Sequence, residues 1–170
     1  MHLNAHRSDL NDAPTRSQIW MRRLTLLALL MAAGVIILGA WTRLSDAGMG
    51  CPDWPGCYGS ASPTGAAAHI SAAQAHMPTG PVTHTKAWIE MIHRYLAMGV
   101  GVLIIASLLI ARRMSRQSEA MRYRPGLPAL LLLFVCVQGA FGAWTVTLKL
   151  QPVIVTIHLL LGMSLLALLT

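Results

Sequence analysis

Four apolar segments constrain the fold of this chain more than any other feature. They cover residues 24–41, 87–111, 127–147 and 153–170, approximately. Each is close to the roughly 20 residues that an α-helix needs to cross the hydrocarbon core of a bilayer. Only 11% of the 170 residues are charged, whereas a soluble domain carries about 25%. The sequence therefore predicts an all-α membrane protein, a bundle of four transmembrane helices.

Similar sequences recur in the two halves of this predicted bundle. The second segment contains WIEMIHRYLAM and the fourth contains VIVTIHLLLGM. When His93 and His158 are aligned, an isoleucine precedes each histidine, a leucine follows three residues later and a methionine five residues later. The word GAWT also occurs twice, at Gly39–Thr42 and at Gly142–Thr145. We therefore predict two repeated helical hairpins, each of which presents one histidine.

Basic residues are distributed unevenly about the four segments. Nine of the 13 fall near the N-terminus or between the second and third segments: Arg7, Arg16, Arg22, Arg23, Arg112, Arg113, Arg116, Arg122 and Arg124. Lysine and arginine are enriched in the cytoplasmic parts of membrane proteins. A cytoplasmic tail over residues 1–19 and a bundle over 20–170 are thus predicted for a protein of the bacterial inner membrane. The net charge of +7 follows from this topology and does not indicate nucleic-acid binding.

With that topology, residues 42–86 form a long loop on the outward, periplasmic side. Its first part, TRLSDAGMGCPDWPGCYGS, is rich in glycine, proline and aspartate and is predicted to be irregular. Its second part, TGAAAHISAAQAHM, is rich in alanine and is predicted to contain a short helix.

His93 and His158 are predicted to lie at one depth on two helices of the same direction. His93 is six residues beyond the outer start of its segment, and His158 is six residues beyond Pro152, which starts the fourth segment on the outer side; six residues span about 9 Å at 1.5 Å per residue. Two facing imidazoles can ligate both axial positions of a haem iron. The alternative is a hydrogen bond from each histidine to a neighbouring helix. Zinc would need three or four protein ligands, and only Glu90 offers another ligand at this depth.

Glu90 and Arg94 flank His93 within the second segment. Glu90 precedes the histidine by three residues and therefore shares its helix face. Its carboxylate could act as a general base or stabilise positive charge on a substrate. It could also form an ion pair with Arg94, four residues later. Arg94 could instead bind a haem propionate, which is an anion suited to a guanidinium group.

Cys51 and Cys57 frame the sequence CPDWPGC in the outward loop. The bacterial periplasm is oxidising, so a disulfide is predicted. A redox-active disulfide and a structural one are both compatible with the sequence. A metal site made of the two cysteines and the loop histidines His69, His76 and His84 is less favoured, because the spacings match no compact finger.

Together these residues resemble the haem A synthase family over residues 35 to the end. The resemblance depends on GAWTRLSDAGMGCPDWPGC, IEMIHR, QGAFGAWTVTLKL and TIHLLLGM. It implies a membrane oxidoreductase that oxidises a ring methyl of haem O to the formyl group of haem A, for cytochrome oxidase assembly. In such an enzyme, residues matching His93 and His158 hold the substrate haem. Glu90 would be catalytic, and the cysteine pair would serve electron transfer or stability.

The family is built from two similar four-helix bundles, and the second one carries a haem B cofactor. This chain matches the first bundle, and we expect it to be the first part of a longer protein. Haem O synthase, cytochrome oxidase assembly factors, membrane lipid and a second copy of the chain are the expected partners. Two other functions remain open: a b-type cytochrome module that carries electrons, and a haem carrier that leaves the methyl group unchanged.

Overall fold

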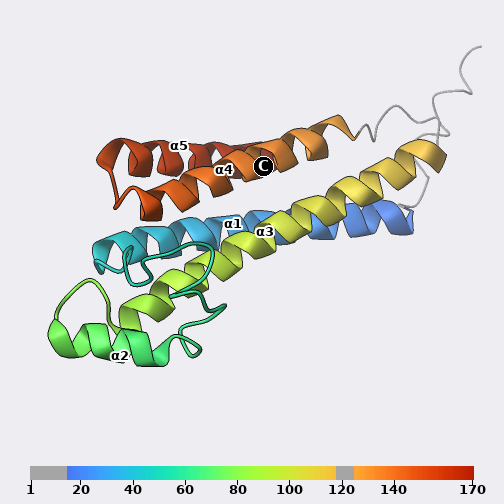
Figure 1. Cartoon of the computed structure of the whole chain (residues 1–170). Coiled ribbons are helices and arrows are strands. Elements are labelled where there is room, and N and C mark those ends of the chain that lie inside the picture. Colours follow the sequence, from blue (N-terminus) through green and yellow to red (C-terminus); the bar gives the residue numbers. More distant parts are fainter. Residues whose placement is uncertain (1–14, 118–124) are drawn as a thin grey trace, which may run out of the picture.

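A computed structural model describes residues 15–117 and 125–170, and every regular element in these two ranges is a helix (Figure 1). The helices are α1 (Arg16–Leu44), α2 (Ala67–His76), α3 (His84–Gln117), α4 (Gly126–Thr147) and α5 (Pro152–Leu169). Four of them, all but α2, are long and apolar enough to cross a membrane. The predictions of an all-helical fold and of four helices long and apolar enough to cross a membrane are therefore confirmed for the described residues.

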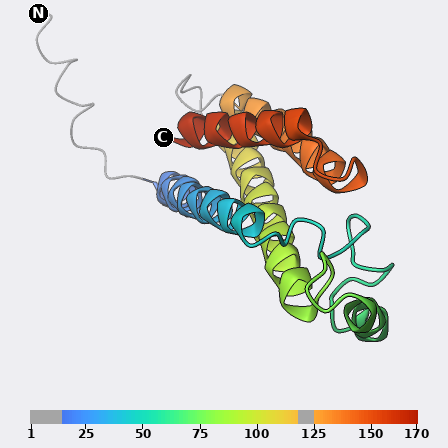
Figure 2. The same ribbon diagram turned by 90° about the vertical axis from the view of Figure 1, so that its left-hand side faces the viewer.

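The four long helices pack as a ring. The most extensive contacts join α1 to α3 and α4 to α5, and further contacts join α3 to α4 and α1 to α5. Figures 1 and 2 show the α4–α5 pair lying on one side of the α1–α3 pair. Within the described ranges no close backbone contact joins α3 to α5. The two helices that carry His93 and His158 therefore lie diagonally across the ring.

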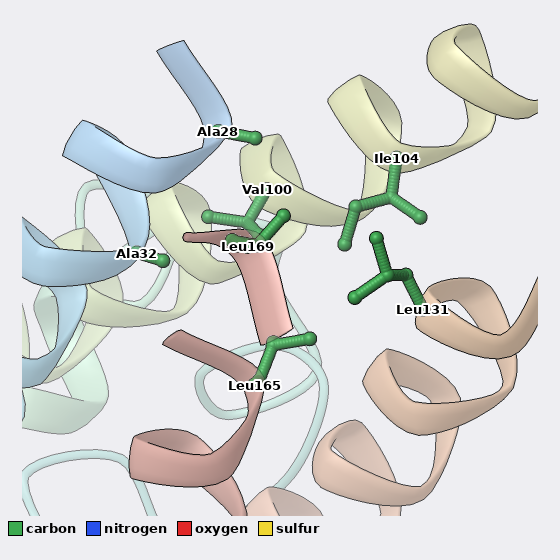
Figure 3. Close-up of a cluster of buried hydrophobic side chains, with 7 residues drawn as sticks. All are labelled: Ala28, Ala32, Val100, Ile104, Leu131, Leu165 and Leu169. Atoms are coloured by element: carbon green, nitrogen blue, oxygen red, sulfur yellow. The ribbon is translucent and has the colours of Figure 1, made fainter. Parts of the chain in front are cut away.

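An apolar cluster joins all four long helices (Figure 3). It is formed by Ala28 and Ala32 of α1, Val100 and Ile104 of α3, Leu131 of α4, and Leu165 and Leu169 of α5. Each of these side chains is at most 8% exposed. His93 precedes the cluster residues of α3, and His158 precedes those of α5. The cluster therefore fills the interior of the bundle beyond both histidines, toward the C-terminal ends of these two helices.

The helices extend beyond the predicted spans because polar turns continue them. At the start of α1, Thr15 Oγ1 accepts a hydrogen bond from the N–H of Gln18, while Gln18 Oε1 accepts one from the N–H of Thr15. This capping box starts the helix at Arg16, so the last residues of the predicted tail 1–19 belong to α1. The rest of the predicted tail, residues 1–14, lies outside the described residues.

Polar turns also lengthen α3, which covers residues 84–117 rather than the predicted 87–111. The first turns of the predicted arginine loop therefore belong to α3, and Arg112 and Arg113 are exposed on it. Arg122 and Arg124 of the same predicted loop lie outside the described residues.

The ends of α1 and α4 have the same hydrogen-bonding pattern. After α1, the N–H of Ala47 donates to the carbonyl of Thr42 at 2.9 Å; after α4, the N–H of Leu150 donates to that of Thr145 at 2.7 Å. The residue before each donor has a left-handed φ, 53° and 51° respectively. Both ends are thus Schellman motifs, and they lie at positions that the two GAWT words align.

The short helix predicted in the alanine-rich part of the loop is also confirmed, as α2. Figure 1 shows α2 at the end of the bundle where α3 begins. Its Ile70 is fully buried and packs in a second apolar cluster with Ala87 and Met91 of α3. The loop between α1 and α3 is therefore a packed layer over the start of α3.

Candidate functional site

One face of α3 holds the outward loop. Ala87, Met91 and Tyr95 recur at intervals of four residues, which places them on one side of a helix. Ala87 and Met91 are buried against both cysteines, and the hydroxyl of Tyr95 donates to the carbonyl of Ala61 at 2.6 Å. The loop is therefore fixed along two turns of α3.

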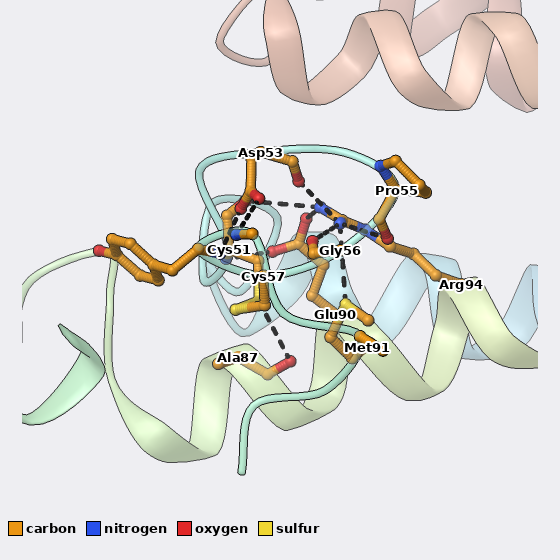
Figure 4. The surroundings of a disulfide bond; sticks show 12 residues. Cys51, Asp53, Pro55, Gly56, Cys57, Ala87, Glu90, Met91 and Arg94 are labelled. Carbon is orange, nitrogen blue, oxygen red and sulfur yellow. Dashed lines mark hydrogen bonds and ion pairs between the residues drawn. A yellow bond between two sulfur atoms is a disulfide. The ribbon is translucent and has the colours of Figure 1, made fainter. Parts of the chain in front are cut away.

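Cys51 and Cys57 form a disulfide that is completely buried (Figure 4). It packs against Ala87 and Met91 of α3, so the bond lies between the loop and the helix. The disulfide that the sequence predicts is thus present. Its position beside α3 was not part of that prediction. A buried bond of this kind ties the loop into the second apolar cluster.

Glu90 lies under this loop with only 3% of its surface exposed. Its Oε2 accepts a hydrogen bond of 2.8 Å from the backbone N–H of Cys51, and its Oε1 is paired with the Nη2 of Arg94. The carboxylate therefore touches a disulfide cysteine on one side and a cation on the other.

The guanidinium group of Arg94 fastens the loop to α3, as Figure 4 shows. Its Nη1 donates to the backbone carbonyls of Asp53 at 2.8 Å and Gly56 at 2.6 Å, and more weakly to that of Pro55 at 3.3 Å. Arg94 is 8% exposed. Of the two predicted roles, the ion pair with Glu90 is present, and the loop carbonyls and the carboxylate engage Nη1 and Nη2 of the guanidinium.

Asp53 is a structural residue of the loop that the sequence analysis did not identify. Its carboxylate accepts hydrogen bonds from the backbone N–H groups of Tyr58 at 2.6 Å and Gly59 at 2.7 Å. Aspartate side chains commonly bind backbone N–H groups in turns. The sequence CPDWPGCYG carries that signal, although the bonds span more residues than a simple aspartate turn.

His93 and His158 each pack against a glycine of the neighbouring helix in their own hairpin. A Cβ added to Gly39 of α1 would lie 2.9 Å from Cε1 of His93. A Cβ added to Gly142 of α4 would lie 3.2 Å from Cε1 of His158. The two glycines open the two GAWT words. A side chain at Gly39 would force the imidazole of His93 to shift, and one at Gly142 would crowd the imidazole of His158.

Both imidazoles retain an unused polar atom. The Nδ1 atoms of His93 and His158 are buried and have no hydrogen-bond partner in the described part of the chain. The third buried side-chain atom in this condition is Oε1 of Gln138 on α4. Buried polar groups are normally paired, so unpaired ones need an explanation. Two imidazoles in a bundle of apolar helices, each with one unpaired nitrogen and each beside a glycine, fit the donor set of an iron-centred macrocycle.

The loop histidines take structural positions instead. His69 stacks on Tyr58 with ring centroids 5.4 Å apart, and Nε2 of His84 lies 2.8 Å from the hydroxyl of Ser71. His76 is exposed at the end of α2. Over residues 15–117 and 125–170 no three metal-binding side chains come together. The structure thus gathers Glu90, Arg94 and the cysteine pair at one place and leaves the loop histidines apart.

Comparisons with known proteins agree on one family. A family model described as cytochrome oxidase assembly protein matches residues 22–170. A protein named heme A synthase from Shewanella oneidensis is 44% identical over 150 residues, which are 88% of this chain and 43% of that protein. Proteins of the same name from Chelativorans sp. and Hyphomonas neptunium are 28% and 27% identical, over 81% and 75% of this chain.

The chain spans less than half the length of these curated relatives, 43%, 40% and 39% respectively. No solved structure matches it.

Proposed function

The chain belongs to the haem A synthase family, and we propose that its four long helices form the half that holds the substrate haem. The proposed reaction is the oxidation of a ring methyl of haem O to the formyl group of haem A. The observation that carries this proposal is the pair of buried histidines whose Nδ1 atoms lack partners. We propose His93 and His158 as the iron ligands of the bound substrate.

Three matched features support two repeated hairpins around that substrate. His93 packs on Gly39 as His158 packs on Gly142, the GAWT words align, and α1 and α4 end in the same Schellman motif. A repeat of this kind presents the two imidazoles from helices on opposite sides of the ring. The proposed domain comprises residues 20–170, with the N-terminus cytoplasmic and loop 42–86 facing the periplasm, as the arginine distribution favours.

Glu90 is the proposed catalytic base. It is one helical turn before His93 and is the only acidic residue in the four apolar segments. Oxidising a methyl group requires that protons leave the substrate, and a positioned carboxylate can accept them. Its bond to the N–H of Cys51 places this group beside the disulfide. We propose that Arg94 holds both the carboxylate and the loop in position.

We propose that the complete enzyme needs parts that this chain does not contain. Because its relatives are more than twice as long, we propose that a second bundle with a haem B cofactor completes the enzyme, or that a second copy of the chain replaces it. Haem O synthase would supply the substrate, and cytochrome oxidase assembly would consume the product.

Haem extraction and mass analysis test the proposal directly. The chain is purified from cells that make haem O, alongside His158→Ala and the control His76→Ala, whose histidine is exposed on α2. We expect haem O with its hydroxylated or formyl derivatives in the wild type and in the control. We also expect loss of the bis-imidazole low-spin spectrum in His158→Ala. Haem B alone, or an unchanged spectrum in His158→Ala, would contradict the proposal.

A further inference from the structure

Gln138 is a half-buried polar residue whose Oε1 atom is buried, and the proposed reaction leaves it without a role. It belongs to the inward stripe of α4, because Leu131, Gln138 and Gly142 are separated by seven and four residues. Leu131 is part of the cluster shared by all four long helices, and Gly142 contacts His158. The amide of Gln138 therefore faces the interior of the bundle rather than lipid.

One end of this amide is fixed. Its Nε2 donates to the backbone carbonyl of His158 at 3.0 Å. A Cβ added to Gly162 would lie 3.1 Å from the same nitrogen and 4.0 Å from Cγ1 of Ile36 on α1. The amide thus sits where α4, α5 and α1 meet. Because only the NH₂ group can donate to a carbonyl, the assignment of the nitrogen also fixes Oε1 as the free end.

The free end is a buried acceptor that lacks a donor. Oε1 has no hydrogen-bond partner among the residues that the structure describes, and leaving such an atom unsatisfied is unfavourable. The other unpaired atom of this hairpin is Nδ1 of His158. Side chains on a helix lean toward its N-terminus, whereas its carbonyls point toward its C-terminus. The imidazole and the amide bound to the carbonyl therefore lie on opposite sides of the Cα of His158.

We infer that Gln138 recognises the hydroxyl group on the hydroxyethylfarnesyl chain of haem O. This inference rests on the proposed function and names the substrate group that the amide would bind. The propionates of a haem are anions and accept hydrogen bonds, so they cannot satisfy an amide oxygen. The hydroxyl is the one donor of haem O outside its iron-bound ring, and haem B, with a vinyl group in its place, has none.

Such a site selects between ligands because a buried hydrogen-bonding group stays unpaired when a ligand without the matching group binds. When a ligand lacking the hydroxyl enters, Oε1 stays buried without a donor, and such sites reject the analogue strongly. The free-energy cost of leaving a buried group without a hydrogen bond corresponds to a loss of roughly 5- to 100-fold in binding affinity. The polar end of Gln138 would thus make the bundle selective for the farnesylated haem over haem B.

The test compares three haems on the purified full chain in detergent, with binding followed by the low-spin absorption spectrum. They are haem O, haem O dehydrated so that the farnesyl chain remains without the hydroxyl, and haem B. We expect the wild type to bind haem O at least about fivefold more tightly than the dehydrated form. Gln138→Met should remove that preference while retaining the spectrum. Val137→Ala, at an exposed neighbouring position, should keep the preference.

The outcomes separate this inference from the proposed function. Equal binding of haem O and its dehydrated form by the wild type would overturn the role of Gln138, while the bis-histidine site would stand. Equal weakening of all three haems in Gln138→Met would also overturn it, because the amide would then support α5 through the carbonyl of His158 without selecting for the hydroxyl. Failure of the wild type to bind any of the three would overturn the proposed function and the role of Gln138 with it.

Discussion

Replacing Arg94 with methionine should release the disulfide loop from α3. Methionine keeps an unbranched apolar stem but removes every hydrogen-bond donor of the guanidinium. The bonds to the carbonyls of Asp53 and Gly56 are lost, and Glu90 keeps only the N–H of Cys51. The Arg94→Met chain should therefore retain its four long helices while the loop opens much more often.

The size of the effect follows from burial. Glu90 is 3% exposed and Arg94 is 8% exposed, so solvent screens their interaction little. Removing one partner of a buried ion pair typically costs 3–5 kcal/mol, because the other charge is left uncompensated. The lower value of about 3 kcal/mol corresponds to roughly a 100-fold increase in the population of the open loop.

Hydrogen exchange followed by mass spectrometry measures this opening locally. Amide protons of the loop around Cys51 should exchange about 100-fold faster in Arg94→Met than in the wild type. Peptides from α5, which contributes to the apolar cluster on the other side of the histidines, should not change. Arg113→Met is the matched control, because that arginine is exposed on the same helix.

A double variant identifies the cause. If the unpaired carboxylate produces the effect, then Glu90→Gln combined with Arg94→Met should exchange more slowly than Arg94→Met alone. Unchanged loop exchange in Arg94→Met would refute the argument that the arginine fastens the loop. Strictly additive effects of the two substitutions would refute the buried charge as the source of the cost.

Two further predictions concern the site itself. Glu90→Gln keeps an oxygen that can accept from the N–H of Cys51, so haem binding should persist while conversion of haem O falls by about 100-fold, the scale of a lost general base; undiminished product formation would remove its catalytic role. Gly39→Ala places a Cβ 2.9 Å from Cε1 of His93, whereas a Cβ at Gly34 meets nothing within 4 Å. Haem retention should therefore fall in Gly39→Ala and not in Gly34→Ala, and equal retention in both would argue against the proposed position of His93.

The sequence predicts the helices well because a membrane leaves few alternatives. Each apolar segment must satisfy its backbone hydrogen bonds internally, so a segment of about 20 apolar residues is a helix. The helix ends are less predictable, because polar turns outside the membrane also form helix. Thr15 starts α1 through a local capping box, and α3 continues through the polar residues Arg112 and Arg113 as far as Gln117.

The residues of the candidate site also fall into two groups: those that can be predicted from the sequence and those that cannot. Glu90, Arg94, His93 and the two cysteines carry recognisable chemistry at recognisable spacing, so the sequence identifies them. What Arg94 binds is not predictable, because its partners are backbone carbonyls of an irregular loop about 40 residues earlier. Gln138 gives no signal in sequence either. Its importance appears only when the structure shows that one end of the amide is bound and the other is buried and free.

The helix α3 connects the two parts of the proposed site. One side of it carries the disulfide loop through Met91 and Tyr95, and another carries His93 against α1. Glu90 lies between these sides and is bonded to Cys51. Glu90 and His93 are separated by less than one turn of the same helix, so α3 fixes the two backbone positions relative to each other. A displacement of Cys51 away from α3 would break its bond to Glu90, so the position of the disulfide loop decides whether the proposed base keeps this hydrogen bond.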